Sequence, residues 1–155
     1  VGKQLKNYLE AFSSNVFAYD TKEIKKETNI NICDSILELI NKCQLIFLTA
    51  SYHNKVIIKK QHIDALRDKY FVNTSRGELI EEEYMINKID LDHFRGLALD
   101  VISNENISTN NLKHFVRAQG KYNVILTPHI SGVTKYSLNT TEDILINLLF
   151  ENLYK

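Results

Sequence analysis

Short apolar runs that alternate with amphipathic stretches constrain the fold of this sequence more than any other feature. The clearest run is CQLIFLTA, residues 43–50, which is apolar over nearly its whole length. Such a run is typical of a strand that is covered on both faces of a sheet. Because strands alternate with helices along the chain, we predict an α/β fold with a doubly wound parallel sheet and right-handed crossovers.

The same patterns predict where each element lies. Strands are expected at residues 16–20, 43–50, 70–72 and 96–101, with a last buried strand that starts at residue 124 and ends at His129. Helices are expected at residues 3–12, 34–42, 59–68, 78–89 and 110–119, and from residue 134 to the C-terminus. Asp34 is the expected N-cap of the second helix, Gly120 should stop the fifth, and residues 22–31 are expected to form a polar connector.

Composition narrows the classes of partner. The chain has 155 residues, 44% of them hydrophobic, with 19 basic side chains against 19 acidic ones. Without a net charge, neither nucleic acid nor an anionic membrane is an expected partner. Cys33 and Cys43 lack metal-ligand spacing, so we expect reduced thiols in a cytoplasmic protein and no metal site. No signal peptide and no apolar run of membrane-spanning length is visible.

Residues 123–132, NVILTPHISG, place a histidine where a strand meets a loop. Pro128 ends the strand because it lacks an N–H group, and the residues from Ile130 to Gly132 form a permissive turn. Ligands bind beyond the carboxyl ends of the strands in open parallel sheets. An imidazole at this edge suits acid–base chemistry near neutral pH, although a lone histidine is more often structural.

The first residues read as half of a dinucleotide-binding unit. A helix follows Val1 and Gly2, and the strand after it ends at Asp20, which lies 18 residues beyond Gly2. In such units a glycine lets a pyrophosphate approach the helix, and the acid accepts hydrogen bonds from the ribose. Gly2 can be only the last glycine of the motif, so the first strand is expected to be absent from this sequence. An aspartate at a strand end is also a common turn residue.

Five polar residues follow predicted strands and are expected at one edge of one sheet: Asp20, Arg76, Asp100, Glu105 and His129. An arginine can grip a carboxylate with two parallel hydrogen bonds. A glutamate can orient and charge an imidazole, which then moves a proton. The combination predicts chemistry on a substrate that carries a carboxylate.

Three segments resemble the signatures of the D-isomer-specific 2-hydroxyacid dehydrogenases. They are NTSRGELI, LALDV followed by a glutamate, and NVILTPHISG. The resemblance implies hydride transfer between NAD(H) and a D-2-hydroxy acid or 2-keto acid. It implies that Arg76 binds the substrate carboxylate, that Glu105 pairs with His129, and that His129 donates or accepts the proton.

The resemblance also implies a Rossmann-like cofactor domain that binds NAD. Asp100 would hold the carboxamide end of the cofactor, and Asp20 would hold the ribose diol and favour NAD over NADP. The other expected cofactor contacts are Val1, Gly2, Thr49, Ala50, Ser75, Arg76, His129, Ser131 and Gly132. Two departures from the family pattern are the missing proline in LTASYHNK and Asn106 in place of a proline after Glu105.

The resemblance also implies a second, substrate-binding domain, which is expected to be absent from this sequence. Residues 1–155 are expected to form the cofactor domain, with residues 136–155 as the crossover helix towards the missing domain. The chain alone is not expected to turn over, and a homodimer through the cofactor domain is expected. Two alternatives are a regulatory or scaffold protein that binds NAD without turnover, and another nucleotide binder in which Arg76 and His129 are structural.

Overall fold

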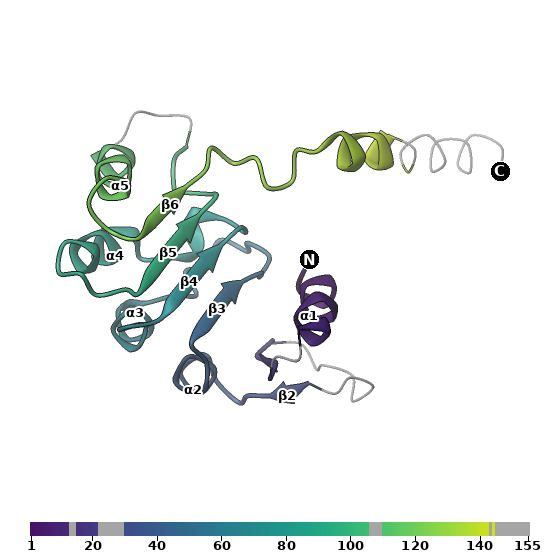
Figure 1. Ribbon diagram of the computed structural model, residues 1–155, viewed down its shortest axis with the longest axis horizontal. Coiled ribbons are helices and arrows are strands. Elements are labelled where there is room, and N and C mark those ends of the chain that lie inside the picture. The colour runs from purple at the N-terminus through teal and green to yellow at the C-terminus, as the bar shows by residue number, and fades with distance from the viewer. Residues whose placement is uncertain (13–14, 22–29, 106–109, 143, 145–155) are drawn as a thin grey trace.

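The computed structural model describes residues 1–12, 15–21, 30–105, 110–142 and 144 (Figure 1). The elements are α1 (Gly2–Ala11), β1 (Phe17–Ala18), β2 (Asn31–Ile32), α2 (Ile36–Lys42), β3 (Leu45–Leu48), α3 (Lys60–Ala65), β4 (Tyr70–Asn73), the 3-10 turn η1 (Gly77–Leu79), α4 (Glu82–Ile89), β5 (Gly96–Leu99), α5 (Asn110–Gln119) and β6 (Val124–Leu126). Residues 135–142 are also helical.

Strands β3, β4, β5 and β6 form one sheet in that order, and every pair is parallel. Helices α2 to α5 form a row in which each helix contacts the next. The predicted alternation of strands and helices around a parallel sheet is therefore confirmed. Since all four strands run the same way, their carboxyl ends share one edge of the sheet.

A second, two-stranded parallel sheet pairs β1 with β2 and stands apart from β3 in Figure 1. Among the described residues no strand joins β1 to β3, as expected for a parallel sheet that lacks its first strand. The prediction of a connector at 22–31 missed β2, which has only two residues, both exposed. Residues 22–29 lie outside the described residues.

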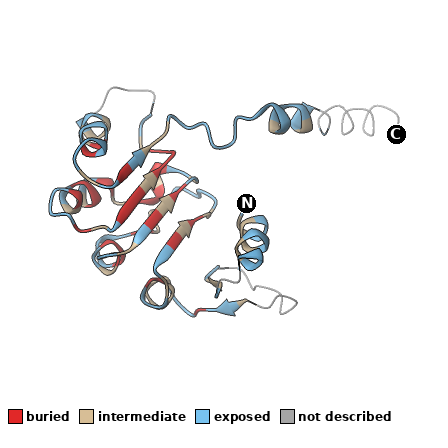
Figure 2. Cartoon of the chain, viewed as in Figure 1, coloured by how far each residue is buried: buried red, intermediate tan, exposed pale blue. Residues whose placement is uncertain are grey.

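The core lies between the four-stranded sheet and the row of helices, as the red segments of Figure 2 show. Phe71 of β4 and Phe115 of α5 are fully buried, as are Ile63 and Met85. The predicted inward orientation of Ile63 and Leu66 is confirmed, because both side chains are inaccessible to solvent. Full burial of one such side chain contributes about 1.5–3 kcal/mol.

The predicted helix at 78–89 is wrong in its first turn. Residues 77–79 form the 3-10 turn instead, and α4 begins at Glu82. The reason is a tertiary contact: Ile80 bridges to Ile58 in parallel, and the N–H groups of Ile57 and Ile58 donate to the carbonyl oxygen of Leu79. The carbonyl oxygen of Leu79 and the N–H of Glu81, which donates to the carbonyl oxygen of Ile58, are thus used between segments and are unavailable for helix.

Two predicted end signals also differ. Asp34 is not the N-cap of α2, because Ser35 Oγ accepts the N–H of Glu38 (3.1 Å) in that role. The fifth helix does end before Gly120, yet this glycine has no positive φ and so does not form a left-handed cap.

Strand β6 is shorter and less buried than predicted. It spans Val124–Leu126 and does not reach His129, and the side chain of Ile125 is 59% exposed. Among the described strands β6 pairs with β5 alone, so it lies at the edge of the sheet.

The predicted C-terminal helix is present at residues 135–142 and projects away from the sheet in Figure 1. Its crossover role towards a second domain stays a prediction, and residues 143 and 145–155 lie outside the described residues. In the part of the chain that the structure describes, no helix is both long and apolar enough to cross a membrane.

Candidate active site at the carboxyl edge of the sheet

The strand register places most of the predicted site residues at one edge. Leu48, Asn73, Leu99 and Leu126 lie side by side in neighbouring strands. Four sets of predicted residues follow these positions: Thr49 and Ala50; Ser75 and Arg76; Asp100 and Glu105; and His129, Ser131 and Gly132. The sheet thus gathers groups that are far apart in the sequence.

The N-terminus of α1 lies against the end of β3. A Cβ atom added to Gly2 would be 2.9 Å from Oγ1 of Thr49, so the glycine permits this close approach. Among the described residues no side chain caps α1, and its first turn holds no acidic residue, which leaves the N–H groups beside Val1 and Gly2 open to an anion.

Asp20 is the exception. It follows β1, which belongs to the two-stranded sheet, and it is exposed. The expectation that all five polar residues share one edge of one sheet is wrong for the described residues, because no strand connects β1 to β3.

The loop after β4 is braced by its own side chains. Ser75 Oγ donates to the carbonyl oxygen of Leu48 (2.8 Å), which ties the loop to β3. The fully buried Asn73 accepts the N–H of Ser75 (2.9 Å) and donates to the carbonyl oxygen of Arg76 (3.0 Å). The sequence analysis missed Asn73, although an asparagine that ends a strand is a known signal for such a turn.

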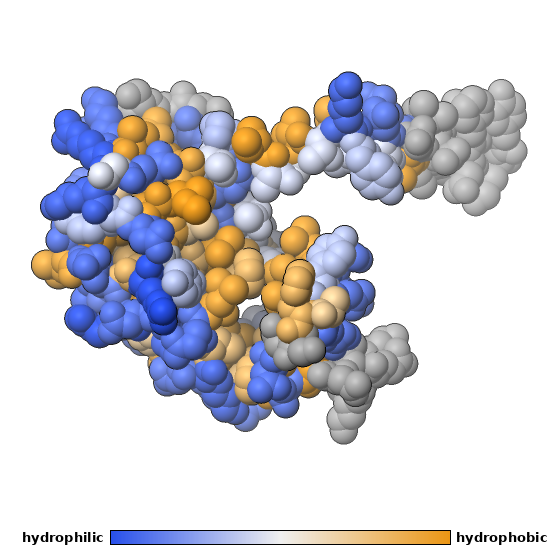
Figure 3. Space-filling model, in the orientation of Figure 1, coloured by the Kyte–Doolittle hydropathy of each residue, from blue (hydrophilic) through white to orange (hydrophobic). Residues whose placement is uncertain are grey.

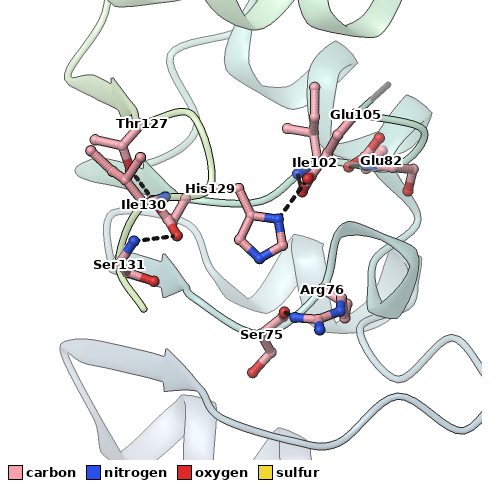
Figure 4. A network of polar contacts seen from close by, with 11 residues as sticks. Ser75, Arg76, Glu82, Ile102, Glu105, Thr127, His129, Ile130 and Ser131 are labelled. Atoms are coloured by element: carbon pink, nitrogen blue, oxygen red, sulfur yellow. Dashed lines mark hydrogen bonds and ion pairs between the residues drawn. The ribbon is translucent and has the colours of Figure 1, made fainter. Parts of the chain in front are cut away.

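Arg76 is exposed, and its Nη1 donates to the neighbouring carbonyl oxygen of Ser75 (2.6 Å). Among the described residues no carboxylate forms an ion pair with the guanidinium. Figure 4 shows Arg76 on the side of the site that faces the ring of His129. The arginine therefore retains donors for an anionic ligand.

Gly77 couples the arginine loop to the loop after β5. A Cβ atom at Gly77 would lie 2.0 Å from the carbonyl carbon of Ile102 and 2.1 Å from the nitrogen of Ser103. Only a residue without a side chain allows these two backbones to touch. The glycine of the SRG sequence is thus required by space, not by its φ angle, since no glycine here has a positive φ.

Asp100 organises the turn that carries His129. This buried carboxylate, 5% exposed, accepts hydrogen bonds from the hydroxyl of Thr127 and from the N–H groups of Ile130 (3.0 Å) and Ser131 (3.0 Å). Burial alone would raise the pKa of Asp100, but the hydrogen bonds from Ser131, Thr127 and Ile130 outweigh it and lower the pKa below 3.8.

The backbone of His129 is strained. Its φ is +53°, a region that non-glycine residues rarely occupy, and its N–H donates to the carbonyl oxygen of Asp100 (2.9 Å). Strain of this kind typically costs 1–3 kcal/mol and often marks a functional site. The Asp100 hydrogen bonds hold the turn in this conformation.

His129 and Glu105 form the predicted pair. Nδ1 of the imidazole lies 2.6 Å from Oε2 of Glu105, and the two side chains are 43% and 31% exposed. The other oxygen, Oε1, accepts the N–H of Ile102 (3.3 Å). A proton on Nδ1 is held by the carboxylate, which leaves Nε2 to exchange a proton with a ligand. Figure 4 shows Nε2 pointing away from Glu105, towards the side of Arg76.

A buried acid behind this pair escaped the sequence analysis. Glu82 lies within EEE at the start of α4, where a run of acids reads as a solvated helix face. Its Oε1 accepts the N–H of Ser103 (2.6 Å), and its Oε2 accepts Nδ2–H of Asn111 (3.5 Å). Nothing in the local pattern separates it from the exposed Glu83.

No group of three or more metal-ligating side chains occurs in the described ranges. His53 lies exposed in the loop after β3. An added Cβ at Gly132 would have nothing within 4 Å, so the surface beside the His129 turn is open.

The sequence is similar to those of known proteins. Residues 1–131 match the model of the D-isomer specific 2-hydroxyacid dehydrogenase NAD binding domain. A hydroxypyruvate reductase of Blautia hydrogenotrophica is 30% identical over 97% of this chain and 47% of the relative. A D-3-phosphoglycerate dehydrogenase of Dictyostelium discoideum is 28% identical over 87% of this chain and 34% of the relative.

The fold also has solved counterparts. The D-lactate dehydrogenase of Aquifex aeolicus, solved with NAD and lactic acid, superposes with a TM-score of 0.86 at 23% identity, over 99% of this chain and 50% of that one. The chain thus spans half or less of the length of these relatives, and its fold is Rossmann-like, as predicted. The match over residues 1–131 shows that the chain belongs to the D-isomer specific 2-hydroxyacid dehydrogenase family, as its NAD-binding domain.

Proposed function

We propose that this chain is the cofactor domain of an enzyme that transfers a hydride between NAD(H) and a D-2-hydroxy acid or its 2-keto acid. The observation that carries the proposal is the Glu105–His129 hydrogen bond of 2.6 Å beside an arginine without an acidic partner among the described residues. A proton carrier and a carboxylate anchor are the two protein groups that this reaction needs.

The residues at the sheet edge fit a dinucleotide. The uncapped N-terminus of α1, with Gly2 close against Thr49, suits a pyrophosphate. We assign the ribose diol to Asp20 and the carboxamide end of the cofactor to Asp100. The cofactor, when bound, supplies or accepts the hydride.

Side chains of the protein bind the substrate and transfer the proton. In the direction of keto-acid reduction, Arg76 binds the substrate carboxylate and polarises the adjacent carbonyl group. His129 gives the proton on Nε2 to the carbonyl oxygen as the hydride reaches carbon, so that a hydroxyl group forms. Glu105 accepts the hydrogen bond from Nδ1–H and thereby orients the ring, so that Nε2 faces the ligand. In the oxidation direction His129 accepts the same proton.

We assign the turnover to the complete protein, since this chain spans half or less of its relatives. Figure 3 shows apolar surface on the segment that leads from the sheet to the helix at 135–142. The exposed apolar residues of this segment, Ile130 and Val133, support a homodimer through this domain. Analytical ultracentrifugation of the chain at several concentrations tests the homodimer. A mass that stays at that of the monomer at every concentration would contradict it. The free thiols of Cys33 and Cys43 support a cytoplasmic location.

The proposal is tested with NADH oxidation by the complete protein against pyruvate, hydroxypyruvate, glyoxylate, 2-ketoglutarate and phosphohydroxypyruvate. Turnover of at least one 2-keto acid is expected, and the active compound names the substrate class. If NADH binds but none of the panel is reduced, the dehydrogenase proposal fails and the NAD-binding regulatory or scaffold alternative takes its place.

A further inference from the structure

Glu82 is a buried carboxylate outside the groups that the reaction uses. It is only 7% exposed, at the first turn of α4. Glutamate is almost never buried to this extent unless it is paired, because desolvation of its charge is costly. No ion pair involves it among the described residues, so its partners are the neutral donors of Ser103 and Asn111.

The surroundings of Glu82 disfavour its charged form. Burial raises the pKa of Glu82 above 4.5, and the hydrogen bonds from Ser103 and Asn111 offset this only in part, while the charge of Glu78 raises it further. Glu82 therefore does not stabilise the fold at neutral pH through its charge. A residue that breaks a local rule at a cost commonly serves a site.

What Glu82 holds is the turn that carries Glu105. Its Oε1 accepts the N–H of Ser103 at 2.6 Å. The peptide bond between Ile102 and Ser103 also packs against the backbone of Gly77. Glu105 lies two residues beyond Ser103, and its own Oε1 accepts the N–H of Ile102. Consecutive N–H groups of one turn are thus bound by Glu105 and Glu82, and Figure 4 shows the two carboxylates on opposite sides of that turn.

We propose that Glu82 is a positioning residue that fixes the 102–105 turn, so that Glu105 meets Nδ1 of His129 and the proton-exchanging nitrogen is Nε2. Asn111 supports it from α5, which packs against α4. The consequence for turnover rests on the proposed function. The tautomer of His129 is independent of the proposed function, because it is a property of the chain without substrate.

The test is ¹⁵N NMR of the His129 ring, at a pH where the imidazole is neutral, in wild type and in Glu82→Leu. Leucine fills the space of the glutamate side chain but accepts no hydrogen bond. Wild type is expected to carry its proton on Nδ1, whereas in Glu82→Leu the Nδ1–H share falls and Nε2–H becomes the main form. Glu82→Gln, which keeps an acceptor for Ser103, should restore the wild-type tautomer.

Glu83→Leu is the matched control, since Glu83 is the exposed neighbour on the same helix. It should leave the His129 signals unchanged. If Glu82→Leu does not fold, Glu82→Met carries the same test with a more adaptable side chain. A folded Glu82→Leu or Glu82→Met protein with the wild-type tautomer would overturn the proposal.

These outcomes are separable from the failure of the proposed function. Absence of NADH oxidation by the wild-type enzyme would leave the tautomer result standing. An unchanged tautomer would reject the role of Glu82 even in an enzyme that turns over. In an active enzyme, Glu82→Leu should lower kcat with little change in NADH affinity, and Glu82→Gln should recover most of kcat.

Discussion

Replacement of Gly77 by alanine tests a backbone contact between two loops. It joins the loop after β4, which carries Arg76, to the loop after β5, which carries Glu105. The added Cβ would lie 2.0 Å from the carbonyl carbon of Ile102, and an ordinary contact begins at 3.4 Å, so the peptide must retreat by about 1.4 Å. Both partners are backbone atoms, so no side-chain rotation can relieve the overlap. Overpacking of this kind costs about 1–3 kcal/mol.

The expected loss of stability is measurable. For a chain of this size 1 kcal/mol shifts the Tm by about 2–4 °C, so Gly77→Ala should lower the Tm by roughly 2–12 °C in a far-ultraviolet circular dichroism melt. Gly120→Ala is the matched control. Its Cβ would meet only the carbonyl oxygen of Arg117 at 3.7 Å, and its φ is not positive, so its stability should be unchanged or about 0.4–1 kcal/mol higher.

The same substitution should damage chemistry beyond its effect on stability. A shift of about 1.4 Å in the 102–105 turn takes the 2.6 Å contact between Glu105 and His129 out of hydrogen-bonding reach. A misplacement of about 1 Å can cost on the order of 100-fold in rate. In the complete enzyme, kcat should fall by this order at temperatures where the variant is folded. A Gly77→Ala protein that melts and turns over like wild type would show that the contact between Gly77 and the 102–103 peptide matters neither for stability nor for catalysis.

Three further substitutions test single roles. His129→Asn should lower kcat by several orders of magnitude while NADH binding, measured by fluorescence titration, persists; asparagine tolerates the positive φ of this position, so comparable loss of both would reject His129 as the proton carrier. Asp20→Ala should narrow the preference for NAD over NADP by roughly 5- to 10-fold, because it removes about 1 kcal/mol of repulsion between the carboxylate and the 2′-phosphate of NADP at 4 Å. An unchanged ratio of the kcat/KM values for NAD and NADP would mean that Asp20 is only the end of a strand. Asp100→Asn should destabilise the chain by about 1.5–3 kcal/mol at neutral pH through its weakened hydrogen bonds. The pKa of Asp100 is lower in the folded protein than its ordinary value of 3.8. The ionised carboxylate therefore stabilises the fold above pH 3.8, and this stabilisation is lost as the pH falls through the pKa of the folded state. The Tm difference between variant and wild type should accordingly shrink below pH 3.8. A difference that is constant with pH would contradict this role.

Much of the candidate site can be predicted from local patterns in the sequence. The apolar runs predict the strands, and Pro128 and the SRG sequence predict where strands give way to loops that present His129 and Arg76. The pairing of Glu105 with His129 is predicted from the residue types that follow the strands and again from the family resemblance, and the structure confirms the contact. Parallel strands then bring the loops together without further information, since all carboxyl ends share one edge.

The remaining features depend on contacts between distant segments. The bridge from Ile58 to Ile80 breaks the predicted helix at its start, although the periodicity of residues 78–89 is helical. The burial of Glu82 depends on the loop after β5, so the local pattern EEE gives no sign of it. The separate position of Asp20 follows from the absence of a strand between β1 and β3 among the described residues.

Isotope labelling of the cofactor follows the transferred hydride itself. The complete protein is incubated with NADH that carries deuterium at the transferred position of C4, together with the 2-keto acid that it reduces fastest. For the proposed function we expect a D-2-hydroxy acid with deuterium on C2, detected by mass spectrometry and chiral chromatography, and almost no product from the His129→Asn variant. A product without deuterium, an L product, or no product from any 2-keto acid would contradict the proposed function.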